Sequence, residues 1–234
     1  MPTLHVVIPF YNEQTTLEPC LVRVLETTLP AGWSRRVVLV DDHSEAGPAE
    51  AARRLCRDLA DRGAPLQLLR HEVNRGKGAA VRTGFDAVLA DSDRDTSDED
   101  ASTGAVIIQD ADLEYDPDDY ACLLQPLIDG TADAVFGTRW GAHRRVAGWR
   151  RLLHMLGNRF LTRISNALTG LDLQDMECCY KVMPVPVLRR VRPSLTEDRF
   201  GVEPQLAAVL ARQRWRVAEV PVRYDPRRFA DGKK

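Results

Sequence analysis

Three carboxylates follow a short apolar run near the middle of the chain. The run Ala105–Ile108 is rich in β-branched residues and predicts a buried strand, and Asp110, Asp112 and Glu114 come directly after it. In an extended segment, residues two apart share a face, so the two aspartates can converge on one point with Glu114 close behind. Like charges this close repel unless a cation lies between them, and hard oxygen ligands suit Mg²⁺ or Mn²⁺. The alternative interpretation is a solvated acidic turn, because a lone Asp-x-Asp is common by chance.

The surrounding sequence predicts the framework that positions these carboxylates. Apolar runs typical of strands alternate with amphipathic stretches typical of helices, which predicts an α/β fold with a mostly parallel sheet and helices on both faces. The predicted strands are 4–8, 37–40, 66–69, 105–108 and 133–136, with a late one over 217–222. Ligands in such folds bind at the carboxyl ends of the strands. Four polar residues fall at those ends and are expected to share one rim: Asp42, Asp110, Asp112 and Arg139.

Length, charge and cysteine usage bound the class of protein. The chain has 234 residues, and we expect a single domain over residues 1–234. A formal net charge of −2 provides no basic field, which argues against a nucleic-acid partner. Its five cysteines lack metal-ligand spacing, which indicates a reducing compartment without a disulfide framework. Without a signal peptide or an apolar run of about 20 residues, we expect a cytoplasmic protein that at most lies peripherally on a membrane.

Three segments carry unusual charge. Residues 91–104 hold six acidic residues against one arginine, and we interpret them as a flexible acidic surface loop rather than a metal site. Residues 149–168 predict a basic amphipathic helix, either an ordinary packed helix or one that lies on anionic lipid. A basic patch within and beside it is a candidate site for an acceptor phosphate and contains Arg144, Arg145, Arg150, Arg151 and His154. Residues 224–234 are a basic tail, either frayed or folded over the site.

A metal held by Asp110 and Asp112 favours an anionic ligand, and a nucleoside diphosphate fits. Arg139, Arg227 and Lys233 are candidates to bind its phosphates. The loop after the first predicted strand has no G-x-G-x-x-G, which disfavours a dehydrogenase-type dinucleotide fold and a nucleotidyltransferase alike. Around Lys77 there are two glycines, but no Ser or Thr follows, so this is not a P-loop.

Several separate motifs resemble one enzyme family. The stretches that carry the likeness are Val7–Glu13, Val40–Ser44, Asn74–Gly78 and Gln109–Glu114, which are similar to family 2 glycosyltransferases of the GT-A fold. Later stretches resemble the polyprenyl-phosphate (dolichyl-phosphate) mannose and glucose synthase branch: Gly137–Arg139, Asp175–Lys181, Glu197–Glu203 and Tyr224–Lys234. One departure is His43, where the family usually has glycine.

The resemblance implies roles for individual residues. Asp110, Asp112 and Glu114 would hold Mg²⁺ or Mn²⁺ and the diphosphate. The nucleotide sugar would contact Pro9, Tyr11, Glu13, Asp41, Asp42, Lys77, Ala111, Arg139, Arg227 and Lys233. In this interpretation Tyr11 packs on the base, Asp42 bonds a base or ribose edge, and Arg139 faces the sugar or the diphosphate.

The implied reaction is an inverting transfer of a hexose from a GDP- or UDP-sugar to a polyprenyl phosphate. A phosphate acceptor is already ionised near neutral pH and needs little base catalysis, whereas a sugar hydroxyl needs a general base. Asp198 is the first candidate for that base and Asp175 the second, although Asp198 is nearly as well explained by an ion pair to Arg199 or Arg192. A hydroxyl acceptor and a non-catalytic sugar-nucleotide-binding protein are the competing functions. Guanine versus uracil and mannose versus glucose stay open.

Overall fold

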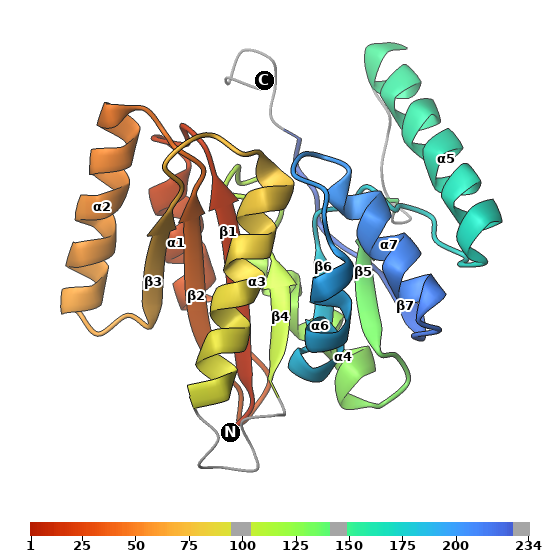
Figure 1. Ribbon diagram of the computed structural model, residues 1–234, viewed down its shortest axis with the longest axis horizontal. Helices are drawn as coiled ribbons and strands as arrows, with labels where there is room; N and C mark the ends of the chain where they lie inside the picture. The colour runs from red at the N-terminus through yellow and green to blue at the C-terminus, as the bar shows by residue number, and fades with distance from the viewer. Residues whose placement is uncertain (95–103, 141–148, 227–234) are drawn as a thin grey trace.

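The computed structural model describes residues 1–94, 104–140 and 149–226. A seven-stranded sheet runs through it in the order β3-β2-β1-β4-β6-β5-β7 (Figure 1). The strands are β1 (Thr3–Phe10), β2 (Ser34–Asp41), β3 (Leu66–Arg70), β4 (Ala105–Ile108), β5 (Ala134–Thr138), β6 (Lys181–Pro184) and β7 (Val217–Pro221). All neighbours pair in parallel except β6, which is antiparallel to both β4 and β5. The prediction of a mostly parallel α/β fold is confirmed.

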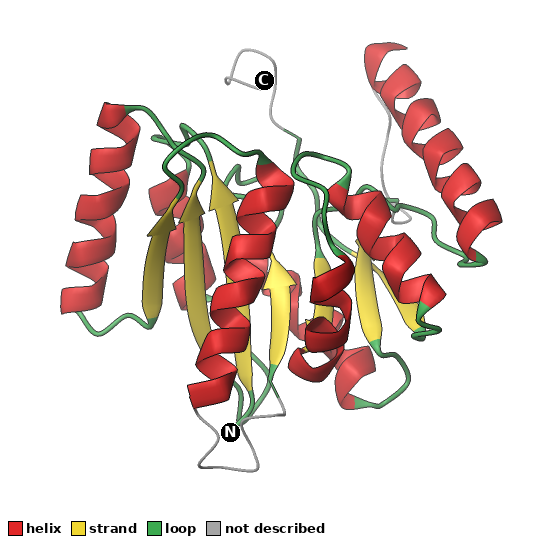
Figure 2. Cartoon of the chain, in the orientation of Figure 1, coloured by secondary structure: helices red, strands yellow, loops and turns green. Residues whose placement is uncertain are grey.

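Helices cover both faces of this sheet (Figure 2). They are α1 (Leu17–Glu26), α2 (Ala46–Asp61), α3 (Lys77–Arg94), α4 (Tyr120–Ile128), α5 (Trp149–Thr169), α6 (Val185–Val191) and α7 (Val202–Arg212), with 3₁₀ turns at Pro117–Asp119 and Arg192–Ser194. In β1, Leu4, Val6, Val7 and Ile8 are all completely buried. A strand that buries consecutive residues has both faces covered, which is why these runs are continuously apolar rather than alternating.

Three neighbouring strands bring the candidate residues to one edge. β1 pairs in parallel with β2 on one side and with β4 on the other. The loops that leave their carboxyl ends therefore lie together at the upper edge in Figure 1. Because Pro9–Glu13, Asp42 and Gln109–Glu114 lie at these strand ends and in the loops that follow them, the expected common rim is present. Next to Asp42, His43 has a φ of 65°, a conformation that glycine adopts without strain.

Two elements differ from the expectation. The segment 91–94 belongs to the last turn of α3 rather than to an acidic loop, and Asp91 is buried there with a carboxylate oxygen 3.2 Å from Arg36 Nε. Residues 95–103 of that predicted loop lie outside the described residues. Strand β6 was not predicted, because it is only four residues long and begins with a lysine. Lys181 is fully buried, donates to the Cys178 carbonyl and lies 4.9 Å from the Phe136 ring centroid.

The predicted helix over 149–168 is present as α5, which packs against α7. Its buried residues include Asn158 and Thr162, but several large apolar side chains face outward: Leu156, Phe160, Leu161, Ile164 and Leu168. Within the described ranges, none of the helices combines the length and apolar character required to cross a bilayer.

Candidate active site

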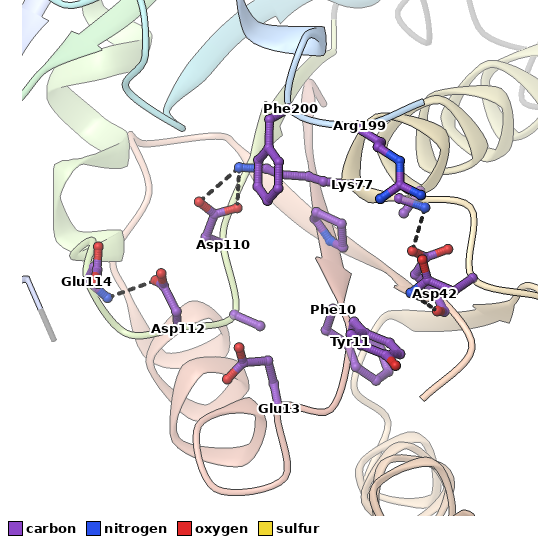
Figure 3. Close-up of a pocket in the computed structure, with 15 residues that line it drawn as sticks. Phe10, Tyr11, Glu13, Asp42, Lys77, Asp110, Asp112, Glu114, Arg199 and Phe200 are labelled. Carbon is purple, nitrogen blue, oxygen red and sulfur yellow. Dashed lines mark hydrogen bonds and ion pairs between the residues drawn. The ribbon is translucent and has the colours of Figure 1, made fainter. Parts of the chain in front are cut away.

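A pocket of ≈ 440 Å³ opens at the rim formed by β1, β2 and β4 (Figure 3). This volume is typical of small-molecule sites. Nine of the residues predicted from the sequence line it: Pro9, Tyr11, Glu13, Asp42, Lys77, Asp110, Ala111, Asp112 and Glu114. Six others line it as well: Phe10, Asn74, Gly76, Ala80, Arg199 and Phe200. The strand-end loops therefore form one side of the pocket, and the segment before α7 contributes to the other.

Asp42 fixes the loop between β3 and α3. Its Oδ1 accepts a hydrogen bond from the Arg75 N–H at 2.9 Å and lies 2.7 Å from His71 Nδ1, while Oδ2 accepts from the Gly76 N–H at 2.7 Å. The other ring nitrogen of His71 lies 2.9 Å from Thr83 Oγ1. A carboxylate with this many donors is held in one orientation. Asp42 thus shapes the pocket in addition to lining it.

Asp41 has a different position from the one expected. It is buried, its Oδ1 accepts from the Ser44 N–H at 2.7 Å, and Oδ2 lies 3.5 Å from Arg70 Nε. Successive strand residues point to opposite sides, so Asp41 and its neighbour cannot both face the pocket. Asp41 is absent from the pocket lining and orders the turn after β2 instead.

The glycines around Lys77 allow two backbones to approach closely. A Cβ on Gly76 would lie 2.5 Å from the Asp198 carbonyl oxygen, and one on Gly78 would lie 2.3 Å from that of Glu197. The Ala79 N–H donates to the Asp198 carbonyl at 3.0 Å. Because no side chain fits between them, this spacing of glycines holds the segment before α7 against the first turn of α3.

Lys77 joins two carboxylates at the far end of the pocket. Its Nζ lies 2.8 Å from Asp110 Oδ1 and 2.9 Å from Glu203 Oε1. Burial alone lowers the pKa of Lys77, but the charges around it, Asp110 foremost, outweigh burial and raise that pKa well above its usual range. For Asp110, burial is the largest single effect and raises the pKa, but the charge of Lys77 together with the hydrogen bonds from Lys77 and Cys179 outweighs it, so the net pKa is below the ordinary value.

The three carboxylates that were predicted to bind a metal, Asp110, Asp112 and Glu114, do not converge on one point. Asp110 turns to Lys77, whereas Asp112 Oδ1 accepts from the Glu114 N–H at 3.0 Å (Figure 3). Residues 111–112 form a turn, and Leu113, between Asp112 and Glu114, has a φ of 63°, so the segment is not extended and residues two apart do not share a face. Across the described part of the chain, no three His, Cys, Asp or Glu side chains are grouped to hold a metal ion.

The donor set nevertheless fits a divalent cation that binds together with a nucleotide. Mg²⁺ is usually held by one or two carboxylates plus substrate phosphates rather than by a complete protein cage. Asp112 supplies such a carboxylate on the pocket wall, with Asp110 on the same loop. Glu114 lies two residues after Asp112 in this loop, and its Oε2 accepts a hydrogen bond from the Tyr224 hydroxyl at 2.7 Å.

Arg139 and Asp175 pair with each other outside the pocket. Arg139 Nε and Nη2 donate to the two carboxylate oxygens of Asp175 at 2.7 and 2.6 Å, and the Arg139 N–H donates to Oδ2 at 3.0 Å. Asp175 is completely buried, and neither residue is among those that line the pocket. The structure therefore gives Arg139 a carboxylate partner, and its role toward the sugar or the diphosphate stays a prediction. A carboxylate enclosed in this way is not positioned as a general base for a bound acceptor.

Asp198 pairs with Arg82, not with Arg199 or Arg192. Arg192 instead donates to Asp86 at 2.6 Å. Hydrogen bonding to Arg82 lowers the pKa of Asp198, whose side chain is 55% exposed. Although the next two residues line the pocket, Asp198 itself does not.

Several predicted contacts fall where no side chain is described. These contacts include residues outside the described ranges: Arg144, Arg145, Arg227 and Lys233. Arg150, Arg151 and His154 belong to the first turns of α5, whose side chains are also outside the description.

The pocket residues that were not predicted differ in how far the sequence indicates them. Asn74 and Gly76 belong to a motif whose two closely spaced glycines point to a close backbone approach. Arg199 and Phe200 lie in a polar segment, where no periodicity distinguishes pocket residues from surface residues. Only the contact between this segment and α3, far apart in sequence, brings them to the pocket.

Comparison with known proteins agrees with this architecture. The family model described as "Glycosyl transferase family 2" matches residues 5–192. Glycosyltransferase AglD of Haloferax volcanii is 25% identical over 227 residues, which cover 96% of this chain and 33% of the relative. The undecaprenyl-phosphate 4-deoxy-4-formamido-L-arabinose transferase of Edwardsiella ictaluri is 28% identical over 230 residues, which cover 98% of this chain and 62% of the relative. The chain thus spans less than two thirds of these curated relatives.

Solved structures share the fold. Glucosyl-3-phosphoglycerate synthase from Mycobacterium tuberculosis superposes with a TM-score of 0.65 at 17% identity, over 98% of this chain and 72% of that one. Mannosyltransferase PcManGT from Pyrobaculum calidifontis gives a TM-score of 0.62 at 22% identity, over 97% of this chain and 58% of that one. These are GT-A glycosyltransferases. Since the family model spans most of the sequence and the sheet has the same architecture, the chain belongs to glycosyl transferase family 2.

Proposed function

We propose that this chain transfers a hexose, with inversion, from a GDP- or UDP-sugar to a polyprenyl phosphate. The observation that carries the proposal is the composition of the rim pocket. It combines a half-exposed aromatic ring, Tyr11, with the carboxylate of Asp112 at the ends of adjacent strands. A ring suits a nucleobase, and a carboxylate suits a cation that bridges to phosphates.

The donor end of the pocket supports a nucleoside diphosphate. Pro9, Tyr11, Glu13, Asp42 and Ala111 would surround the nucleoside. Asp112, with Asp110 on the same loop, would hold Mg²⁺ or Mn²⁺ against the diphosphate, and when bound the cation would neutralise charge on the departing group. The named complexes of the structural neighbours include Mn²⁺ with UDP in one protein and Mn²⁺ with GDP-Man in the other.

The start of the C-terminal tail supports its proposed role over the donor. The Asp225 N–H donates to the Glu114 carbonyl at 2.8 Å, and Tyr224 forms a β-bridge with Tyr115. The chain is thereby fixed beside the metal-binding loop immediately before the basic residues of the tail. Arg227 and Lys233 would then bind the phosphates and exclude water from the reaction.

The state of the carboxylates favours a phosphate acceptor over a hydroxyl. A hydroxyl needs a base, yet Asp198 is paired with Arg82 and has a lowered pKa, which weakens it as a base, and Asp175 is enclosed by Arg139. A phosphate is already ionised and needs no such group. One curated relative is named as an undecaprenyl-phosphate sugar transferase.

Helix α5 supports a membrane surface as the place of reaction. Leu156, Phe160, Ile164 and Leu168 are spaced four residues apart and are all exposed. No acidic residue occurs in Trp149–Thr169, which contains four arginines. A helix of this kind binds anionic lipid with its apolar side buried in the headgroup region. We place it on the cytoplasmic face of a membrane. Arg150, Arg151 and His154 would then receive the acceptor phosphate.

The test is a panel of nucleotide sugars incubated with polyprenyl phosphate and Mg²⁺, with the lipid-linked product detected by mass spectrometry. The proposal expects one donor to give a product of one added hexose, and Asp112→Ala to give none at unchanged melting temperature. A donor-dependent thermal shift without product or released nucleotide would instead indicate a binding protein. Product that appears only with hydroxyl acceptors would support a transferase that uses a hydroxyl acceptor, with Asp198 as the first candidate for its general base.

A further inference from the structure

The described wall of the pocket carries more negative than positive charge. Five carboxylates line it: Glu13, Asp42, Asp110, Asp112 and Glu114. Among the lining residues there are two cationic side chains, Lys77 and Arg199. An anionic ligand that enters such a pocket therefore depends strongly on each positive group that can reach it.

The charge of Lys77 is already neutralised within the protein. Its ammonium group lies 2.8 Å from one oxygen of Asp110 and 2.9 Å from one oxygen of Glu203. These two carboxylates supply more negative charge than the lysine supplies positive charge. Lys77 therefore organises the far end of the pocket, and little of its charge is available to a ligand.

Arg199 is in the opposite situation. Its side chain is exposed, and within the described part of the chain its guanidinium donates no hydrogen bond and forms no ion pair. In Figure 3 it extends from the segment before α7 toward the end of the pocket where Asp42 lies, whereas Phe200 extends toward the end where Asp110 lies. Unlike Lys77, Arg199 keeps its donors and its charge for a ligand.

The backbone that carries Arg199 is fixed in place. Arg82 donates to the carboxylate of Asp198 and to the Glu197 carbonyl, and the Ala79 N–H donates to the Asp198 carbonyl. Gly76 and Gly78 leave no space for this segment to move toward α3. An unpaired guanidinium on an anchored backbone is preorganised to bind an anion, since only the side chain has to be ordered on binding.

We propose that Arg199 is a donor-binding residue that pairs with the phosphate next to the nucleoside of the nucleotide sugar, because its side chain extends toward Asp42, at the end of the pocket assigned to the nucleoside (Figure 3). The inference rests on the proposed function, because it takes the pocket to be the donor site. Arginine matches phosphate oxygens through two parallel N–H donors, and charge-assisted bonds of this kind are the stronger hydrogen bonds in proteins. Arg199 would thus supply to the donor the positive charge that Lys77 gives to Asp110 and Glu203.

The experiment measures binding of nucleosides, nucleoside monophosphates and nucleoside diphosphates of uracil and guanine by calorimetry in Mg²⁺. The variants are Arg199→Ala, Arg199→Lys and, as the matched control, Arg62→Ala, an exposed arginine at the end of α2 away from the pocket. We expect Arg199→Ala to weaken the diphosphate about 10- to 100-fold, the size of a lost charge-assisted bond. Arg199→Lys should recover part of the loss, Arg62→Ala should match the wild type, and nucleoside affinity should not change.

The outcomes separate this inference from the proposed function. Weaker diphosphate binding with a shallower salt dependence in Arg199→Ala supports the phosphate contact. Equal loss for the nucleoside and the diphosphate overturns it in favour of a contact with the base, and no loss at all overturns it outright while the proposed function stands. A wild-type protein that binds no nucleoside diphosphate overturns both. Melting temperatures of the variants, expected to be unchanged for an exposed and unpaired side chain, exclude unfolding as the cause.

Discussion

The ammonium group of Lys77 lies 2.8 Å from Oδ1 of Asp110, so the first residue of α3 is tied to the loop after β4 at the far end of the pocket. Glu203, in the first turn of α7, shares the same ammonium group. One side chain therefore links three elements that are distant in sequence. The exposed fractions of Lys77 and Asp110 are 18% and 22%, so water screens this network only partly.

Lys77→Met should destabilise the protein by about 2–4 kcal/mol, because it leaves two carboxylates close together without their cation. The measurement is urea unfolding at pH 7, where the midpoint should fall at unchanged slope. Arg53→Met is the control, since Arg53 pairs with Glu50 on the exposed face of α2 and should change stability by less than about 1 kcal/mol. Equal effects of the two substitutions would contradict the structural role assigned to Lys77.

The stability should fall on acidification in a way that depends on Asp110. The pKa of its carboxyl is lower in the folded protein than in the unfolded chain, where it is about 3.9. The unfolded state therefore binds the proton first, and the stabilisation present above pH 4 is lost as the pH falls through the folded pKa. Urea unfolding between pH 6 and pH 3 should show a shallower decline for Asp110→Asn than for the wild type. Asp58→Asn, exposed on α2, should keep the wild-type slope.

Gly78→Ala should displace the segment that carries Arg199, although Gly78 itself does not line the pocket. The added methyl group would lie 2.3 Å from the Glu197 carbonyl oxygen and 2.8 Å from that of Arg199, so one backbone has to shift. We expect a loss of about 1–3 kcal/mol in stability and weaker nucleotide binding by calorimetry. In Gly47→Ala, the methyl group meets no atom within 4 Å, and stability should stay the same or rise by up to about 1 kcal/mol. Wild-type behaviour of Gly78→Ala would show that the two backbones separate easily.

The parts of the fold that were predicted share one physical cause. Strands buried on both faces are continuous apolar runs, so β1, β2 and β4 and the rim at their carboxyl ends follow from hydrophobic pattern alone. Most of the strand-end residues that line the pocket were found for that reason. Strand β6 gives no such pattern, because its first residue is a lysine whose charge is accommodated by a carbonyl and an aromatic ring.

The parts that were not predicted depend on contacts or dihedral angles that the sequence does not display. The turn over residues 111–112 and the positive φ of Leu113 separate the carboxylates that an extended segment would have brought together. Asp91 was interpreted as part of a solvated loop because acidic residues surround it, whereas its partner Arg36 comes from β2. Likewise, the pairing of Arg139 with Asp175 removes both from the pocket, although each residue type suits the chemistry expected there.

Phe160→Asp should reduce binding to vesicles that contain anionic lipid. Phe160 is 64% exposed on α5, between Arg159 and other basic residues of the helix, and its burial in the headgroup region would contribute about 2 kcal/mol. Cosedimentation should therefore show a weaker affinity by about 10-fold or more, whereas donor binding in solution stays unchanged. The control is Val73→Asp, an exposed apolar residue outside α5. If both variants bind vesicles like the wild type, α5 is an ordinary packed helix.

Tyr224→Phe tests whether the segment around Tyr224 supports the Gln109–Glu114 loop, which we propose binds the metal. The hydroxyl of Tyr224 donates to Glu114 Oε2 at 2.7 Å, and its ring centroid lies 5.1 Å from that of Tyr115. The substitution keeps the ring and the backbone bridge but removes the donor, so we expect a stability loss of only about 1 kcal/mol. If Glu114 helps to orient the loop that carries Asp112, Mn²⁺ should bind more weakly in the presence of nucleoside diphosphate, a change that electron paramagnetic resonance titration measures. Nucleotide affinity without metal should change little. Unaltered Mn²⁺ affinity would mean that Tyr224 and Glu114 hold the chain terminus in place without acting on the metal.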